Sequence, residues 1–263
     1  LVVALLGVCG ALGMWVDTMD TLAMTIAAVV LSLLIGIPMG IWAGLSDRVL
    51  KLVTPILDLA QILPTLVYMA PIALVFMIGA ASATIATMIY AIPISIRITS
   101  HAIRNLNQSP IEASESIGST KKQTLFKVQL PMAKQMIVLG INQTVMAALS
   151  FVVIAALIAA PGLGKPIVSA LTIQNTGKGL VAGIAVVAMA IMLDRATSAA
   201  AVKQKTFIPP TPKQLAARRR NVTISGVVTL LIAFASHSIE KLQNFPVNPN
   251  IALKVETVTN NIV

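Results

Sequence analysis

The sequence is poor in the residues that form disulfides, metal sites and enzyme active sites. It has one cysteine, Cys9, and two histidines, His101 and His237, among 263 residues. One cysteine excludes an internal disulfide, and this set is too small for a transition-metal cluster. No phosphate-binding loop is present, since residues 162–165 lack its first glycine and are followed by proline. We therefore expect no catalytic residue, metal or cofactor in this chain.

Charge is also scarce. Charged residues make up 11% of the sequence and hydrophobic residues 57%, with a mean hydropathy of +0.89. A soluble domain of this length cannot bury so much apolar surface, so the solvent must be lipid. The apolar runs lack the alternation of barrel strands, which predicts an all-α, polytopic integral membrane helical bundle. Seven hydrophobic segments are expected, at about 1–16, 21–45, 62–79, 83–99, 136–160, 180–193 and 222–237.

The basic residues predict an orientation in the membrane. The net charge is +10, but Lys and Arg lie between hydrophobic segments, which favours lipid headgroups over nucleic acid as their partner. With the loop at about 100–135 in the cytoplasm, fifteen basic residues lie on that side and four on the other. The positive-inside rule then predicts a cytoplasmic amino end and an external carboxyl end.

Glycines in the second segment suggest close helix packing. Gly36, Gly40 and Gly44 recur every four residues, a spacing that lets two helix backbones approach. Packing within one subunit is the favoured interpretation, and a subunit interface is the alternative.

Polar residues at membrane depth are few. Asn142, Gln143, Thr144 and Ser150 interrupt the fifth segment. Such residues face either a water-filled pathway or another helix, and both interpretations stay open.

Residues 109–131 form the one long polar stretch between hydrophobic segments. Ser109 with Glu112 predicts a capping box, and Gly118 a left-handed helix end. Ser119 or Thr120 is expected to start a second short helix, with Gln123 placed to cap back onto Thr120, and Pro131 is expected to stop it. The stretch is therefore a docking surface for another protein or an ordered surface loop.

The same stretch resembles a known family. Glu112-Ala113-Ser114, then Gly118, then Val128-x-Leu130-Pro131 is similar to the "EAA" loop of permease subunits of bacterial binding-protein-dependent ABC importers. The family pattern is E-A-A-x3-G-x9-I-x-L-P, from which Ser114 and Val128 depart. Residues 55–71, 126–131 and 140–144 resemble the glycine betaine/proline/choline branch, and the similarity covers roughly 20–198.

The resemblance implies a type I ABC importer permease in the bacterial plasma membrane. It implies a cytoplasmic ATPase subunit, which would bind ATP and Mg and receive the loop at Glu112, with motion carried through Pro131. It also implies a second permease copy and a periplasmic or lipid-anchored solute-binding protein. Gly162 and Gly164 would lie at the outer mouth. The solute would be of the betaine type, and another solute (an amino acid or trimethylamine oxide) is the alternative within the family. A carrier driven by an ion gradient is the alternative outside the family.

Two further expectations concern aromatic residues and domain organisation. For a quaternary ammonium solute, Tyr68, Tyr90 and Phe151 offer a weak, transient cation–π site, although simple packing is the favoured interpretation. The transmembrane domain is expected over 1–198, a basic, proline-containing linker over 199–221, and a short hydrophobic segment with a polar tail over 222–263. The last part departs from the family, and a fragment, a truncated fusion and an extra anchor all remain open. Residue 1 is Leu, so the true start is expected upstream.

Overall fold

The computed structural model describes residues 2–202 and 250–260, and every regular element in these ranges is helical. The elements in chain order are α1 (Val2–Ala11), α2 (Trp15–Leu45), α3 (Asp47–Ile62), α4 (Thr65–Phe76), α5 (Ala80–Arg104), α6 (Gln108–Ser116), α7 (Lys121–Thr124), the π-helix η1 (Leu125–Gln129), α8 (Leu130–Ile154), the 3-10 helix η2 (Ala155–Ile158), α9 (Gly164–Thr172), α10 (Thr176–Val202) and α13 (Asn250–Asn260). The hydrophobic segment predicted at 222–237 lies outside the described residues.

Four helical runs of the described chain are long and apolar enough to cross a membrane. They are Trp15–Leu45, Ala80–Arg104, Lys121–Ile158 and Thr176–Ser198. These runs confirm the all-α membrane bundle, and they correspond to the second, fourth, fifth and sixth predicted segments.

The first and third segments were predicted wrongly. Residues 1–16 do not form one unit, because α1 ends at Ala11 and Trp15 already begins α2. Residues 62–79 are not one straight span, because the chain bends by 92° between α3 and α4. Pro64 lies at this break, where it has no N–H to continue the α3 ladder. α3 and α4 together form a broken span or a re-entrant loop.

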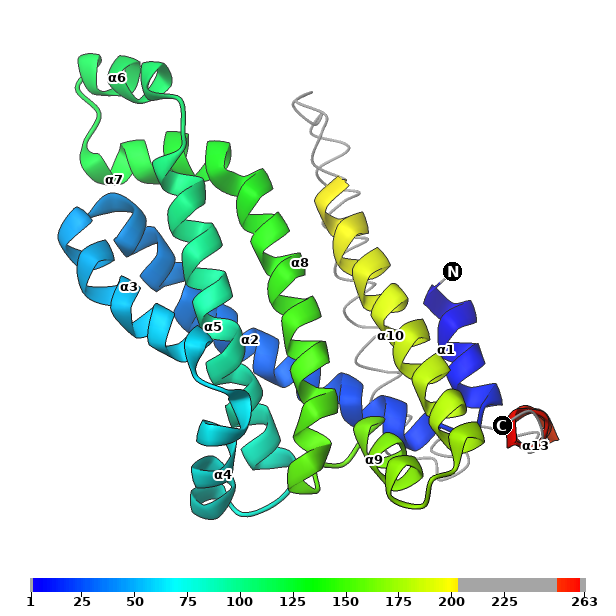
Figure 1. The fold of residues 1–263 in the computed structure, drawn as a ribbon. Coiled ribbons are helices and arrows are strands. Elements are labelled where there is room, and N and C mark those ends of the chain that lie inside the picture. The colour runs from blue at the N-terminus through cyan, green and yellow to red at the C-terminus, as the bar shows by residue number, and fades with distance from the viewer. Residues whose placement is uncertain (1, 203–249, 261–263) are drawn as a thin grey trace, which may run out of the picture.

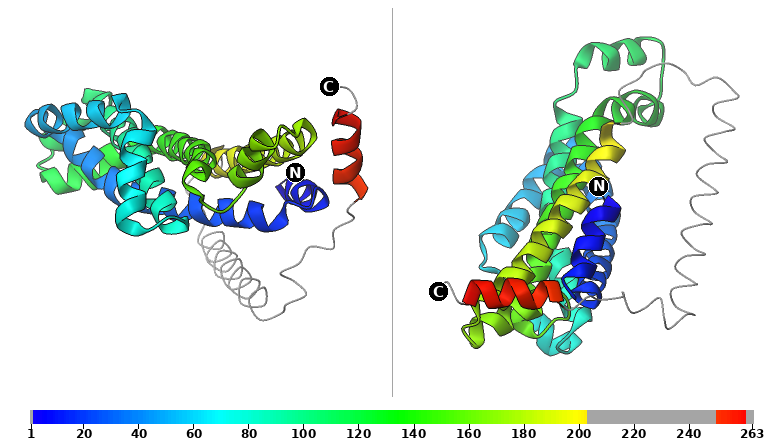
Figure 2. Two further views of the ribbon diagram at one scale, coloured as in Figure 1. Left: turned by 60° about the horizontal axis from the view of Figure 1, so that its bottom comes forward. Right: turned by 90° about the vertical axis from the view of Figure 1, so that its right-hand side faces the viewer.

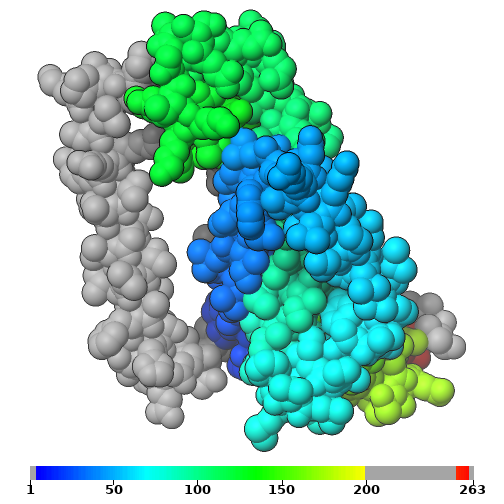
Figure 3. Space-filling model, turned by 90° about the vertical axis from the view of Figure 1, so that its left-hand side faces the viewer, coloured from blue at the N-terminus to red at the C-terminus, as the bar shows by residue number. Residues whose placement is uncertain are grey.

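The helices form an elongated bundle with a short-helix structure at each end. α6 and α7 lie at one end, and α4 and α9 lie at the other (Figure 1). α3 and α4 cover one outer face of the molecule (Figure 3). α13 lies beside α10 and α1 (Figure 2). It is held there by Asn175 Nδ2, which donates to Glu256 Oε1 at 2.9 Å, and by the Gly177 N–H, which donates to Asn260 Oδ1 at 2.9 Å.

The glycines of α2 pack against α5 of the same chain. A Cβ on Gly36 would lie 1.9 Å from Ser95 Oγ, and one on Gly40 would lie 2.6 Å from Thr99 Cβ. One on Gly44 would lie 2.8 Å from the Cβ of Ile103, one further turn along α5. The three contacts follow the four-residue spacing on both helices, so the two backbones meet along two full turns.

Candidate functional site

The polar stretch folds into an elbow, defined here as residues 105–131, at one end of the bundle. Its first helix, α6, begins at Asn107, whose side chain accepts a hydrogen bond from the Ser109 N–H at 3.1 Å. The capping box predicted for Ser109 and Glu112 is therefore wrong. Asn107 is the N-cap residue because its backbone is extended, whereas Ser109 already lies inside the helix.

The turn of the elbow is a glycine-terminated helix end. Gly118 has a φ of +80°, as predicted. The Gly118 N–H donates to the Glu115 carbonyl at 2.9 Å, and the Ser119 N–H donates to the Ser114 carbonyl at 3.2 Å. This pair of bonds is the Schellman arrangement, which satisfies the last carbonyls of α6.

The second short helix is capped by Thr120, one of the two predicted starting residues. The Thr120 side chain accepts from the Gln123 N–H, and the Gln123 side chain accepts from the Thr120 N–H, which completes a capping box. The Ser114 and Thr124 hydroxyl oxygens lie 3.2 Å apart in a buried contact between α6 and α7. Ile111 is also buried, so the two helices form one compact unit.

Pro131 does not stop the helix, contrary to the prediction. Lys121 to Ile158 is one continuous run, in which η1 precedes the proline and α8 begins around it. The Leu130 N–H reaches back to the Leu125 carbonyl, five residues earlier. The wider π-turn accommodates a residue that has no N–H, so the helix continues from the elbow into the membrane.

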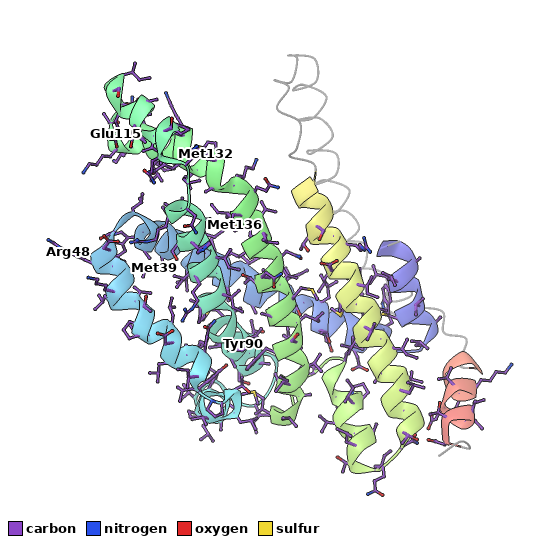
Figure 4. The ribbon with its side chains drawn as sticks, turned by 45° about the horizontal axis from the view of Figure 1, so that its top comes forward. Met39, Arg48, Tyr90, Glu115, Met132 and Met136 are labelled. Atoms are coloured by element: carbon purple, nitrogen blue, oxygen red, sulfur yellow. The ribbon has the colours of Figure 1, made fainter. Side chains whose placement is uncertain are left out.

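The outer surface of the elbow mixes charge with exposed apolar side chains. Glu112, Ala113 and Glu115 are exposed on α6, and Figure 4 shows Glu115 at the far end of the molecule. Ile117 is 85% exposed and Phe126 66% exposed, whereas Val128 and Leu130 are half-buried. Large apolar groups beside charged ones are typical of a protein-binding surface.

The structure separates the polar residues of the fifth segment. Thr144 is buried and donates to the Gly140 carbonyl at 2.8 Å, and Ser150 donates to the Met146 carbonyl at 3.0 Å. Gln143 is exposed, whereas Asn142 turns toward α10. The four residues therefore do not line one continuous surface.

Asn142 is the centre of a polar contact between α8 and α10. Its Nδ2 donates to Asp194 Oδ1 at 3.3 Å, and its Oδ1 accepts from Thr197 Oγ1. A cavity of about 520 Å³ opens beside this contact. It is lined by polar and apolar side chains, among them Met132 and Met136 of α8 (Figure 4). From the sequence, Asp194 was assigned no role at this contact. A carboxylate near the end of an apolar helix is nevertheless a signal from which a buried polar contact can be predicted.

The two tyrosines stack on Phe151. The Tyr68 and Phe151 ring centroids are 6.1 Å apart with nearly parallel planes, and those of Tyr90 and Phe151 are 5.0 Å apart. Phe151 is fully buried. The rings thus cover one another, as in aromatic packing.

The loop after α8 is held against α2. Gly162 has a φ of +104°, and a Cβ there would lie 2.4 Å from Thr21 Oγ1. The Leu163 N–H donates to the same Thr21 oxygen at 2.8 Å. Gly164 is equally confined, since a Cβ would lie 2.3 Å from the Val153 carbonyl oxygen. Thr21 could not be identified from the sequence, because its hydrogen-bond partner is 142 residues away.

Comparison with known proteins supports one family. A profile described as "Binding-protein-dependent transport system inner membrane component" matches residues 36–201. The glycine betaine permease OpuAB of Bacillus subtilis is 48% identical over 195 residues, which cover 74% of this chain and 69% of OpuAB. The glycine betaine/proline betaine permease ProW of Escherichia coli is 43% identical over 190 residues, covering 72% of this chain and 54% of ProW. The chain thus spans little more than half of ProW.

The fold agrees with that of a solved transporter. A structure of the MetNI methionine ABC transporter in an inward-facing conformation matches with a TM-score of 0.67 at 23% identity, covering 72% of this chain and 96% of the matched one. At 23% identity, this similarity supports a shared fold and not a shared solute. With the family profile spanning most of the chain, and with several apolar helices, the protein is a multi-pass membrane protein that belongs to the family of binding-protein-dependent transport system inner membrane components.

Proposed function

We propose that this chain is the membrane-spanning subunit of an ATP-driven importer for a compatible solute of the betaine type. The observation that carries the solute class is the 48% identity over 195 residues to a glycine betaine permease. A shared pathway is expected at this identity, because the match extends over most of the membrane-embedded helices.

The elbow is proposed as the contact with a separate cytoplasmic ATPase subunit. Its support is physical: two short helices tied together by Ser114 and Thr124 present exposed Glu112 and Ile117 to a partner. The helical run continues from Lys121 through η1 into α8, so movement of the elbow would be passed on to α8. The conformation of the elbow would be maintained by Gly118, Val128, Leu130 and Pro131.

Assembly and orientation are part of the proposal. Two copies of the chain would enclose the pathway, with two ATPases below it and a solute-binding protein above it. The basic bias of the sequence supports an elbow that faces the cytoplasm, which leaves Gly162 and Gly164 near the outer mouth. Residues 1–198 would form the transmembrane permease domain.

A reconstituted transporter tests this function. The full-length protein, its ATPase and its binding protein would be placed in liposomes with ATP inside, and uptake of labelled glycine betaine measured. ATP-dependent uptake that excess unlabelled betaine abolishes is expected. Uptake that needs no ATPase and disappears with the ion gradient would instead identify a secondary carrier.

Trimethylamine N-oxide is a second candidate solute. A permease named for trimethylamine N-oxide transport in Pelagibacter ubique is 38% identical to this chain over 192 residues. Competition between the two solutes in the same vesicles ranks them, and we expect betaine to compete at the lower concentration.

A further inference from the structure

Two ion pairs connect α3 to α5 within the described part of the chain. Arg104 pairs with Asp47, which joins the last residue of α5 to the first of α3. Arg97 pairs with Asp58, further inside both helices. Arg97 lies seven residues before the end of α5, which places it about 10 Å deeper along the helix. With Ala80–Arg104 crossing the membrane, as the proposed orientation has it, the inner pair then lies inside that span.

The Asp58–Arg97 pair is only half covered by its own chain. The side chains are 48% and 39% exposed, respectively. Ionised groups in contact with lipid are costly, so the face that carries them adjoins water or another polar surface. The Arg97 Nε, in addition, is buried and has no hydrogen-bond acceptor. The guanidinium thus keeps a donor that the protein does not satisfy.

The surroundings of Asp58 support a water-facing position. Lys51, Thr54, Asp58 and Gln61 follow at helical spacing and form one polar stripe along α3. The stripe is flanked on one side by Val53 and Leu57, which are buried against α5. Leu52, Ile56 and Leu59, all more than half exposed, lie on another flank. α3 accordingly separates an apolar face from a polar one.

We propose that Asp58 and Arg97 form a charge pair in the solute pathway and recognise a zwitterion as it passes. A betaine carries one carboxylate and one quaternary ammonium, the same two charges as the pair. The solute carboxylate would accept from the exposed part of the Arg97 guanidinium, while the cation lies near the Asp58 carboxylate. This inference rests on the proposed function, and it assigns a specificity role to two residues of known position.

A charge-reversal experiment separates recognition from a structural latch. Betaine uptake by the reconstituted transporter would be compared between wild type and three variants: Asp58→Asn, Arg97→Gln and the double variant Asp58→Arg/Arg97→Asp. A recognition role predicts that all three raise the KM for uptake about ten- to a hundredfold, the size of one or two charge-assisted hydrogen bonds. The double variant keeps an ion pair but inverts its polarity. A wild-type KM in the double variant would overturn the inference. An ion pair that only holds α3 against α5 works equally well when its two charges are exchanged.

The outer pair supplies the matched control. Asp47→Arg/Arg104→Asp inverts a pair that joins the same helices at their ends, and it is expected to leave the KM unchanged. An equal loss in both double variants would contradict recognition by the inner pair.

A second measurement does not depend on transport. Single cysteines at Gln61 and at Leu59, each with Cys9→Ala, would be exposed to a charged thiol reagent in membranes. Labelling of Gln61→Cys that betaine slows, with Leu59→Cys unreactive, is expected. Unreactive Gln61→Cys would overturn the pathway position, whatever the solute. Wild-type protein that imports no betaine while Gln61→Cys still reacts would count against the proposed function alone.

Discussion

Ser114 and Thr124 face each other across the elbow, with their hydroxyl oxygens 3.2 Å apart in a buried contact. The family pattern has alanine where this chain has Ser114, so this bond is a local addition that joins α6 to α7. It joins α6 and α7 into one unit, as the proposed contact with an ATPase subunit requires.

Removing one hydroxyl of this pair is expected to cost more than removing both. Ser114→Ala and Thr124→Val each leave a buried hydroxyl without a partner, at a cost of about 1–3 kcal/mol. The double variant leaves none and should recover part of that loss. Thermal unfolding of the purified transporter measures the three variants, and additive losses would show that the two hydroxyls act independently.

Gly118 is expected to tolerate only residues that accept a left-handed backbone. Its φ of +80° costs an L-residue about 1–2 kcal/mol, whereas Asn accepts it more readily. A Cβ at Gly118 would meet nothing within 4 Å, so backbone strain is the only penalty. Gly118→Asn should therefore retain uptake, Gly118→Ala should weaken it, and Gly118→Pro, with φ locked near −65°, should abolish it. Protein levels in the membrane are measured alongside, and full uptake by the proline variant would refute the role of the turn.

Glu112 is expected to be needed for coupling rather than for folding. Its side chain is exposed, so Glu112→Lys should leave the protein in the membrane at the wild-type amount. A reversed charge at a protein contact costs several kcal/mol, which predicts uptake below about a tenth of wild type. Glu115→Lys makes the same change one turn away and serves as the control. Equal losses from both substitutions would point to the net charge of the elbow instead of a specific contact.

The α2–α5 contact is expected to tolerate no larger residue at Gly40. A Cβ there would lie 2.6 Å from Thr99 Cβ and 2.9 Å from the Ile96 carbonyl oxygen. Gly40→Val should destabilise the bundle by about 1–3 kcal/mol or more, seen as a lower unfolding temperature. Gly183→Ala is the control, because nothing lies within 4 Å of a Cβ at that position. Similar losses at both sites would mean that the contact is looser than described.

Local chemistry explains which parts of the structure were predictable. Gly118 and the Thr120–Gln123 box were predictable because the residues that determine them are adjacent in the sequence. Asn107 was missed because Ser109 offered an equally good cap, and only the backbone conformation distinguishes them. Pro131 was misjudged because a π-turn, which has no sequence signature here, accommodates it.

Contacts between distant residues could not be predicted. The bond from Leu163 to Thr21 and the pair of Asp58 with Arg97 depend on how helices cross, which one sequence does not specify. Gly36, Gly40 and Gly44 indicated a close approach of two helices, but only the structure identifies α5 as the partner. Asn142, Gln143 and Thr144 were expected to face either a water-filled pathway or another helix, and only the structure shows that Asn142 contacts α10, Gln143 is exposed and Thr144 is buried.

A cross-link from the elbow tests the proposed contact with the ATPase subunit. Ile117 is 85% exposed at the tip of the elbow, so Ile117→Cys with Cys9→Ala gives one reactive thiol there. In the assembled transporter, a short bifunctional reagent should join this thiol to the ATPase subunit and stop uptake, whereas Thr172→Cys, at the opposite end, should give no such product. Betaine accumulation that continues while Ile117→Cys never reaches the ATPase would contradict the account.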